Sequence, residues 1–207
     1  MSFRQTAKLA LASLAFALVS TQVIAEPVID KPAPAFTGKA ADGSTINLAD
    51  LKGKTVVLEW TNHDCPYVIK HYDKSGNIPS LQKDATENGV VWLQVISSAP
   101  GKQGNVDGAT AISLNEKRGA TPTNTILDPE GTIGKLYNAQ TSPHFFIINP
   151  EGTLVYKGGV DSIKSANEAD IPKAKPYVKE ALEALAAGKK IPNPSTAPYG
   201  CSIKYAS

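Results

Sequence analysis

The sequence predicts an α/β fold in which a central mixed β-sheet is flanked by helices. Two short apolar segments, "TVVLEW" (55–60) and "VVWLQVI" (90–96), have the composition of buried strands. Segments with helical patterns separate the strands, which implies parallel strands covered by helices on both faces of the sheet. Late in the chain, "HFFIIN" and "TLVYKGG" are joined by a "PEG" turn. That pattern predicts a hairpin and an antiparallel edge.

The elements can be placed in order. Residues 27–38 are rich in proline and should lie extended on the surface, and 41–54 should form a turn, a short strand and a turn. Strands are expected at 55–60, 90–96, 123–128, 144–149 and 153–159. Helices are expected from about Cys65, with Asp64 as N-cap and Pro66 in the first turn, and within 78–89, 109–119, 129–138 and 174–190.

The first 25 residues are interpreted as a secretory signal peptide. Arg4 and Lys8 form a basic start, residues 9–19 are apolar, and Ala25 stands at the cleavage position. The apolar run is short for a membrane span. An uncleaved N-terminal anchor is the alternative interpretation.

We therefore expect one thiol-bearing mature domain, residues 26–207, with a Pro-rich tail from about residue 191. Its expected location is periplasmic or secreted, without stable membrane insertion after cleavage. Loss of Arg4 and Lys8 removes two of the 21 basic side chains and leaves 19 against 19 acidic ones. A neutral chain without a basic, aromatic patch is not expected to bind nucleic acid.

Cys65, one of two cysteines, lies in "EWTNHDCPYVIKHY" directly after a buried strand. In an open α/β sheet this is the carboxyl end of a strand, where functional sites form. The sequence places the thiol at a helix start, where unpaired backbone amides favour negative charge. A protonated His63 nearby would favour the thiolate further, so we interpret Cys65 as a reactive thiol. A buried, inert cysteine is the alternative.

The quoted segments carry a resemblance to a known family. "VIDKPAPAFTGKAADGSTINLADLKGKTVVLEW", "NHDCPYVIKHY", "TSPHFFIINPEGTLVYKGGVD" and "YGCSIKY" resemble the thioredoxin-like superfamily, in its peroxiredoxin-like branch of alkyl hydroperoxide reductases and thiol-specific antioxidants. The similarity covers about Asp30 to Leu185. It implies a thioredoxin-like fold, Cys65 as the reactive thiol, and a strand beginning at Pro143 that follows a loop facing the thiol. His144 should then lie near Cys65. Whether Pro143 is cis stays open.

The chain also departs from the patterns of these relatives. Val68 occupies the position of the second thioredoxin cysteine, so a local dithiol cannot form. Asn62 and Leu58 stand where typical peroxiredoxins carry threonine and proline. Arg118 is the only arginine after residue 25.

The resemblance implies an exported thiol oxidoreductase with antioxidant activity and no cofactor. Cys65 would attack a peroxide or a disulfide, Cys201 would resolve the product, and an external thiol protein would reduce the enzyme. The expected substrate-positioning residues are Thr61, Asn62, His63, Ser142 and Pro143. A flexible tail could bring Cys201 to Cys65. A permanent structural disulfide and a lone tail thiol are the alternatives for Cys201.

A metal-binding module without turnover is the rival function. Cys65, Cys201, His63 and His71 are residue types that bind copper(I) or zinc. The eight-residue spacing of the two histidines, across the start of a helix, does not place both on one metal. We therefore predict no metal site.

Overall fold

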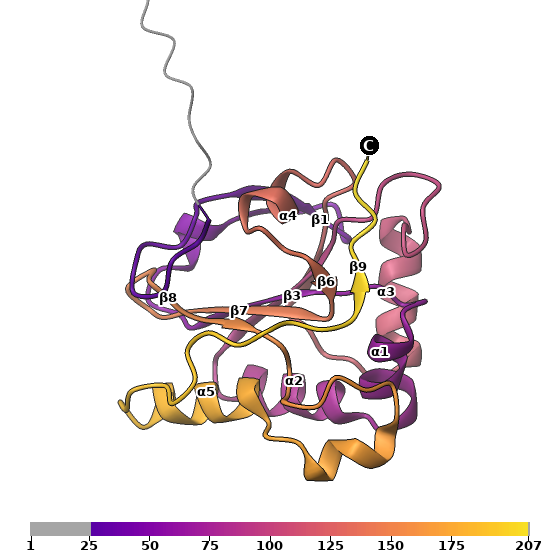
Figure 1. Cartoon of the computed structure of the whole chain (residues 1–207). Coiled ribbons are helices and arrows are strands. Elements are labelled where there is room, and N and C mark those ends of the chain that lie inside the picture. The colour runs from indigo at the N-terminus through magenta and orange to yellow at the C-terminus, as the bar shows by residue number, and fades with distance from the viewer. Residues whose placement is uncertain (1–25, 207) are drawn as a thin grey trace, which may run out of the picture.

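A computed structural model describes residues 26–206 of the chain. One seven-stranded sheet runs in the order β2-β1-β5-β4-β3-β7-β8, and β6 and β9 form a separate two-stranded pair (Figure 1). The strands are β1 (Thr37–Ala40), β2 (Thr45–Asn47), β3 (Val56–Trp60), β4 (Val91–Ile96), β5 (Asn124–Leu127), β6 (Thr141–Ser142), β7 (His144–Ile148), β8 (Leu154–Gly158) and β9 (Cys201–Ser202).

The sheet is mixed, as the sequence predicts. β3, β4 and β5 pair in parallel, and β7 joins β3 antiparallel with Trp60 opposite His144. The β7–β8 hairpin forms the expected antiparallel edge. Two of the three parallel strands, β3 and β4, are the segments with continuous apolar composition, which fits strands covered on both faces.

Helices cover both faces of the sheet. They are α1 (Pro66–Ile69), α2 (Asn77–Glu87), α3 (Gly108–Lys117), α4 (Thr132–Leu136) and α5 (Tyr177–Ala186), with 3₁₀ turns η1 (Leu48–Leu51) and η3 (Glu168–Lys173) and a π-helical turn η2 (Lys70–Lys74). Figure 1 shows α2 and α5 on one face and α4 on the other. One apolar core lies on the α2–α5 face and includes Val57, Cys65 and Val178, and a second lies on the α4 face and includes Leu58 and Ile133.

The structure corrects the expected start of the first helix. α1 begins at Pro66, and Cys65 itself is the N-cap residue, in place of Asp64. The side chain of Asn62 accepts a hydrogen bond from the Asp64 amide at 3.0 Å. The turn before the helix is therefore closed by Asn62, an Asx-type arrangement.

The C-terminal tail is built into the fold. Lys157 of β8 pairs with Ser195, and β9 then pairs with β6 so that Cys201 lies opposite Ser142. In Figure 1 this segment is yellow and reaches the loop that carries β6. The tail that was expected to bring Cys201 to Cys65 is paired with the rest of the fold at several points.

The expected signal peptide, residues 1–25, lies outside the described residues. Among residues 26–206, none of the helices has the length and apolar character needed to cross a membrane.

Candidate thiol site

Cys65 is placed by the loop that leaves β3. Its amide donates to the carbonyl of Asn62 at 3.1 Å, and the Asn62 side chain donates to the carbonyl of Gln103 at 3.3 Å. The Cys65 side chain is 0% exposed. The thiol therefore lies at the carboxyl end of a central strand, as predicted, but it is not accessible to solvent.

The two cysteines meet, although 136 residues separate them in the chain. Both are free, and their Sγ atoms are 2.6 Å apart. The β6–β9 pairing places Cys201 opposite Ser142, and the Ser142–Pro143 peptide bond is cis. This loop brings Ser142, Pro143 and Cys201 to the reactive-thiol position.

The hydrogen bond of Cys65 differs from the expected one. Its Sγ donates to the carbonyl oxygen of Ser142 at 3.1 Å, and the helix start makes no hydrogen bond to the side chain. The Cys65 sulfur is therefore buried against a backbone carbonyl, in contrast to the amide donors that the sequence suggests.

The pKa of the Cys201 thiol is raised to about 12, first by burial and then by the hydrogen bond and the charge of the adjacent Cys65 sulfur. At neutral pH Cys201 therefore keeps its proton. This suits a residue that reacts second, after Cys65 has been oxidised.

The other predicted positioning residues, Thr61, Asn62 and His63, differ in the contacts that their side chains make. Thr61 is buried, and its Oγ1 has no hydrogen-bond partner within the described chain. Asn62 uses its side chain to fix the loop. The His63 ring lies 3.3 Å from Asp64 Oδ1, and its backbone carbonyl accepts from Arg118 at 3.0 Å. Within residues 26–206, the His63 side chain therefore contacts Asp64 and makes no hydrogen bond to Cys65.

The expectation that His144 lies near the thiol is wrong. Its ring packs on Phe146 with centroids 4.5 Å apart, and Phe146 belongs to the core on the α4 face. Cys65 lies in the core on the opposite face. Alternation of side chains along β7 puts His144 and Phe146 on the same side, so this signal was present in the sequence.

Of the four residues considered for a metal, the two cysteines meet, but the two histidines make their contacts elsewhere. His71 is buried and contacts Tyr199 and Asn77 through its two ring nitrogens. Within residues 26–206, no group of three His, Cys, Asp or Glu side chains is arranged to hold one ion.

The structure also contains a buried carboxyl group that the sequence patterns did not predict. Glu59 of β3 is 0% exposed and accepts hydrogen bonds from Tyr72 at 2.6 Å, Trp92 at 2.7 Å and Gln82 at 3.0 Å. Burial raises its pKa to about 7, against the effect of these hydrogen bonds. A single glutamate in an otherwise apolar strand six residues before the thiol was the available signal.

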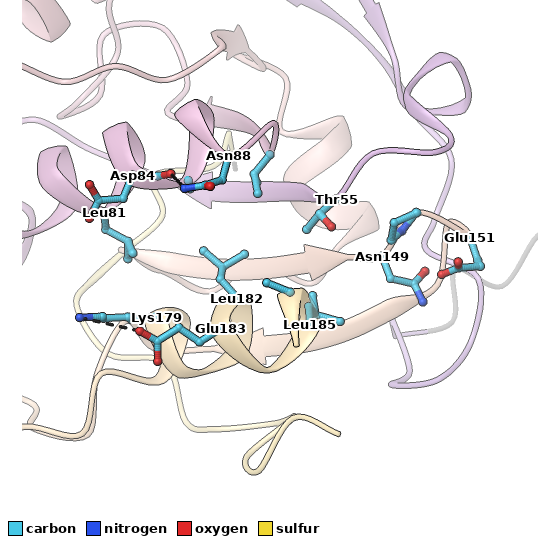
Figure 2. Close-up of a pocket in the computed structure, with 14 residues that line it drawn as sticks. Thr55, Leu81, Asp84, Asn88, Asn149, Glu151, Lys179, Leu182, Glu183 and Leu185 are labelled. Carbon is cyan, nitrogen blue, oxygen red and sulfur yellow. Dashed lines mark hydrogen bonds and ion pairs between the residues drawn. The ribbon is translucent and has the colours of Figure 1, made fainter. Parts of the chain in front are cut away.

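A cavity of about 590 Å³ lies away from the thiol (Figure 2). Leu81 of α2 and Leu182 and Leu185 of α5 line its sides, and Glu151 of the β7–β8 turn lies at its end. Thr55, which precedes β3, also lines it, whereas Cys65 follows the other end of that strand. The thiol chemistry is therefore assigned to the β3–α1 junction and not to this cavity.

Comparisons with known proteins agree with the geometry. The model of the AhpC/TSA family matches residues 29–157. The crystal structure of an uncharacterized conserved protein from Geobacillus kaustophilus is 26% identical and covers 86% of this chain and 93% of that chain, with a TM-score of 0.74. Hypothetical protein SMc02350 from Sinorhizobium meliloti 1021 is 20% identical, with coverages of 88% and 97% and a TM-score of 0.72.

A more distant likeness concerns the fold alone. The "putative Thiol:disulfide interchange protein DsbE" of Chlorobium tepidum is 18% identical, with coverages of 79% and 98% and a TM-score of 0.53. The fold is thioredoxin-like, a mixed sheet flanked by helices. A comparison with curated proteins found no match.

Proposed function

Because its family model matches most of the chain, the protein belongs to the AhpC/TSA family, and from this membership we propose that it is an exported thiol oxidoreductase that reacts through Cys65. Family membership supports thiol-redox activity in general. The observation that carries the specific assignment is the 2.6 Å approach of the Cys65 and Cys201 sulfurs beside the Ser142–Pro143 loop.

With a peroxide as substrate, the reaction has two steps. Cys65, as thiolate, attacks one peroxide oxygen, the O–O bond breaks, and an alcohol or water leaves with a proton while the sulfur becomes a sulfenic acid. The Cys201 sulfur then attacks Cys65, an S–S bond forms, and the sulfenic oxygen leaves as water with the Cys201 proton. An external dithiol reduces this disulfide and is itself oxidised.

With a disulfide as substrate, the same residues perform exchange. Cys65 attacks one substrate sulfur, the substrate S–S bond breaks, and one substrate thiol leaves. Cys201 then displaces the second substrate thiol from the mixed disulfide. In both cases two electrons pass from the cysteine pair to the substrate.

Three polar residues have distinct proposed roles around this pair. Thr61, whose buried Oγ1 has no hydrogen-bond partner among residues 26–206, donates to a substrate oxygen in the peroxide reaction. Asn62 and His63 position the loop that carries Cys65, through the side chain of Asn62 and the backbone carbonyl of His63.

The test compares wild type, Cys65→Ser and Cys201→Ser in assays of peroxide consumption and of disulfide reduction, with mass spectrometry of the products. We expect Cys65→Ser to abolish turnover of the preferred substrate. We expect Cys201→Ser to complete one reaction and to accumulate a sulfenic acid or a mixed disulfide on Cys65. Full turnover by Cys65→Ser, or a Cys65–Cys201 bond that no thiol reductant opens in the folded protein, would contradict the proposal.

A further inference from the structure

The sulfur that must react is covered by the chain's own C-terminus. Cys65 is 0% exposed, and its Sγ contacts the Ser142 carbonyl and the Cys201 sulfur. We call residues 198–205 the C-terminal strap. In this arrangement an outside substrate cannot reach Cys65, so the reaction requires the strap to move.

After Cys201, the strap is held mostly through its backbone. The Ile203 amide donates to the Gln140 carbonyl at 3.1 Å, and the Lys204 carbonyl accepts from the Ala99 amide at 2.8 Å. The Tyr205 hydroxyl donates to the Ala139 carbonyl at 2.8 Å. The backbone bonds do not depend on side-chain identity.

Before Cys201, a single buried side chain holds the strap. Tyr199 is 4% exposed, and its hydroxyl donates to Asp161 Oδ1 at 2.6 Å. His71 Nε2 lies 3.1 Å from the same hydroxyl, and the amide nitrogen of Asn77 lies 2.9 Å from His71 Nδ1. An amide nitrogen can only donate, so Nδ1 accepts and Nε2 carries the proton that it donates to Tyr199. The hydroxyl therefore donates one hydrogen bond and accepts one.

Three of the side chains around Tyr199 come from the segment that begins at Cys65. The Tyr67 ring meets the Tyr199 ring edge-on with centroids 5.8 Å apart, and Lys70 Nζ lies 5.8 Å from the centroid of the Tyr199 ring. Residues 65–71 thus supply both the thiol and most of the pocket that receives the strap two residues before Cys201. Occupation of that pocket and coverage of the thiol are therefore geometrically linked.

We propose that Tyr199 is a positioning residue that holds the C-terminal strap closed over Cys65 and keeps Cys201 against it. Cys65 meets an outside substrate in the open form, in which Tyr199 has left its pocket, and closure then delivers Cys201. This inference rests on the proposed roles of the two cysteines, but the opening of the strap can be measured without turnover.

The test measures iodoacetamide labelling of Cys65 in a Cys201→Ser background, with and without Tyr199→Phe. Phenylalanine keeps the ring and removes the hydroxyl, so the buried Asp161 carboxylate and the His71 imidazole each lose one hydrogen bond. The open fraction, and with it the labelling rate, should rise at least about tenfold. Tyr137→Phe is the matched control, because Tyr137 is buried in the other core and donates one hydrogen bond, to the Pro34 carbonyl at 2.7 Å. An unchanged rate in Tyr199→Phe, or an equal rise in the control, would overturn the inference.

Amide hydrogen exchange supplies a second measurement. In Tyr199→Phe the Ile203 amide should exchange at least about tenfold faster, while the amides of β3 keep their wild-type rates. Equal acceleration at both places would show general destabilisation and would overturn the inference. If labelling and exchange behave as expected while wild type turns over no substrate, the inference about the strap stands and the proposed function fails. If wild type turns over substrate but Tyr199→Phe leaves the labelling rate unchanged, the proposed function stands and the inference about the strap fails.

Discussion

The substitution Glu59→Gln gives the sharpest test of the buried hydrogen-bond network around Glu59. Glu59 has a pKa of about 7 in the folded protein, against 4.5 for an exposed glutamate, because burial penalises its charged form. A raised folded pKa contributes stability that is fully present below pH 4.5 and is lost as the pH rises through 7. The variant lacks this titration but keeps the shape of the side chain.

The magnitude follows from the shift. A difference of one pKa unit corresponds to about 1.4 kcal/mol, so the full contribution is roughly 3 kcal/mol, and roughly 2–3 kcal/mol of it is lost between pH 5 and pH 8. Two buried histidines titrate in the opposite sense. Burial lowers the pKa of His71 to about 4 and that of His144 to about 3, so their contribution is lost as the pH falls from 6.5. Because wild type and variant share both histidines, the difference between the two proteins isolates Glu59.

The assay is urea unfolding of both proteins at pH 5 and pH 8, with the thiols kept reduced. Relative to Glu59→Gln, wild type should lose roughly 2–3 kcal/mol of unfolding free energy on going from pH 5 to pH 8. Glu116→Gln, which removes an exposed carboxyl on α3, controls for the loss of one negative charge. A stability difference between wild type and Glu59→Gln that is independent of pH would refute the reasoning.

Two further predictions concern the cysteine pair. Gly200→Ala should slow formation of the Cys65–Cys201 disulfide at least about tenfold by mass spectrometry after oxidation, because a Cβ there would collide with the Ser142 carbonyl and φ is +143°. Gly188→Ala, also at positive φ but in open space, should leave that rate unchanged; equal slowing in both variants would contradict the steric argument. In Cys65→Ser the pKa of Cys201 should fall from about 12 but stay above 9.0, because burial, the larger cause, remains. A pH profile of alkylation measures this, and a value at or below 9.0 would contradict it.

Local pattern was sufficient to predict most of the sheet. The segments "TVVLEW" and "VVWLQVI" contain β3 and β4, and "HFFIIN" with "TLVYKGG" contains the β7–β8 hairpin. The apolar composition of each segment indicates a buried strand. The place of Cys65, after β3 and before a helix with Pro66 at its start, followed from the same local signals.

The covering of Cys65 by the C-terminal strap could not be predicted from local sequence patterns. β6 and β9 are each two residues long, which is too short for a periodic pattern. They pair at a separation of some 60 residues in sequence, so no local signal connects them. Tyr199 resembles any aromatic residue of a Pro-rich tail until Asp161 and His71 are brought to its hydroxyl. Glu59 likewise acquires its raised pKa only from the residues that the fold packs around it.

The π-helical turn after α1 explains how one short segment serves both networks. Lys70, His71 and Tyr72 are consecutive and all buried. Successive side chains on a helix point about 100° apart, so three in a row can be buried only where the helix is covered on more than one side. Tyr72 donates to Glu59 on the sheet side, whereas His71 contacts Tyr199 of the strap. Since this turn continues directly from the helix that Cys65 caps, the thiol lies where the buried carboxyl network and the strap are joined.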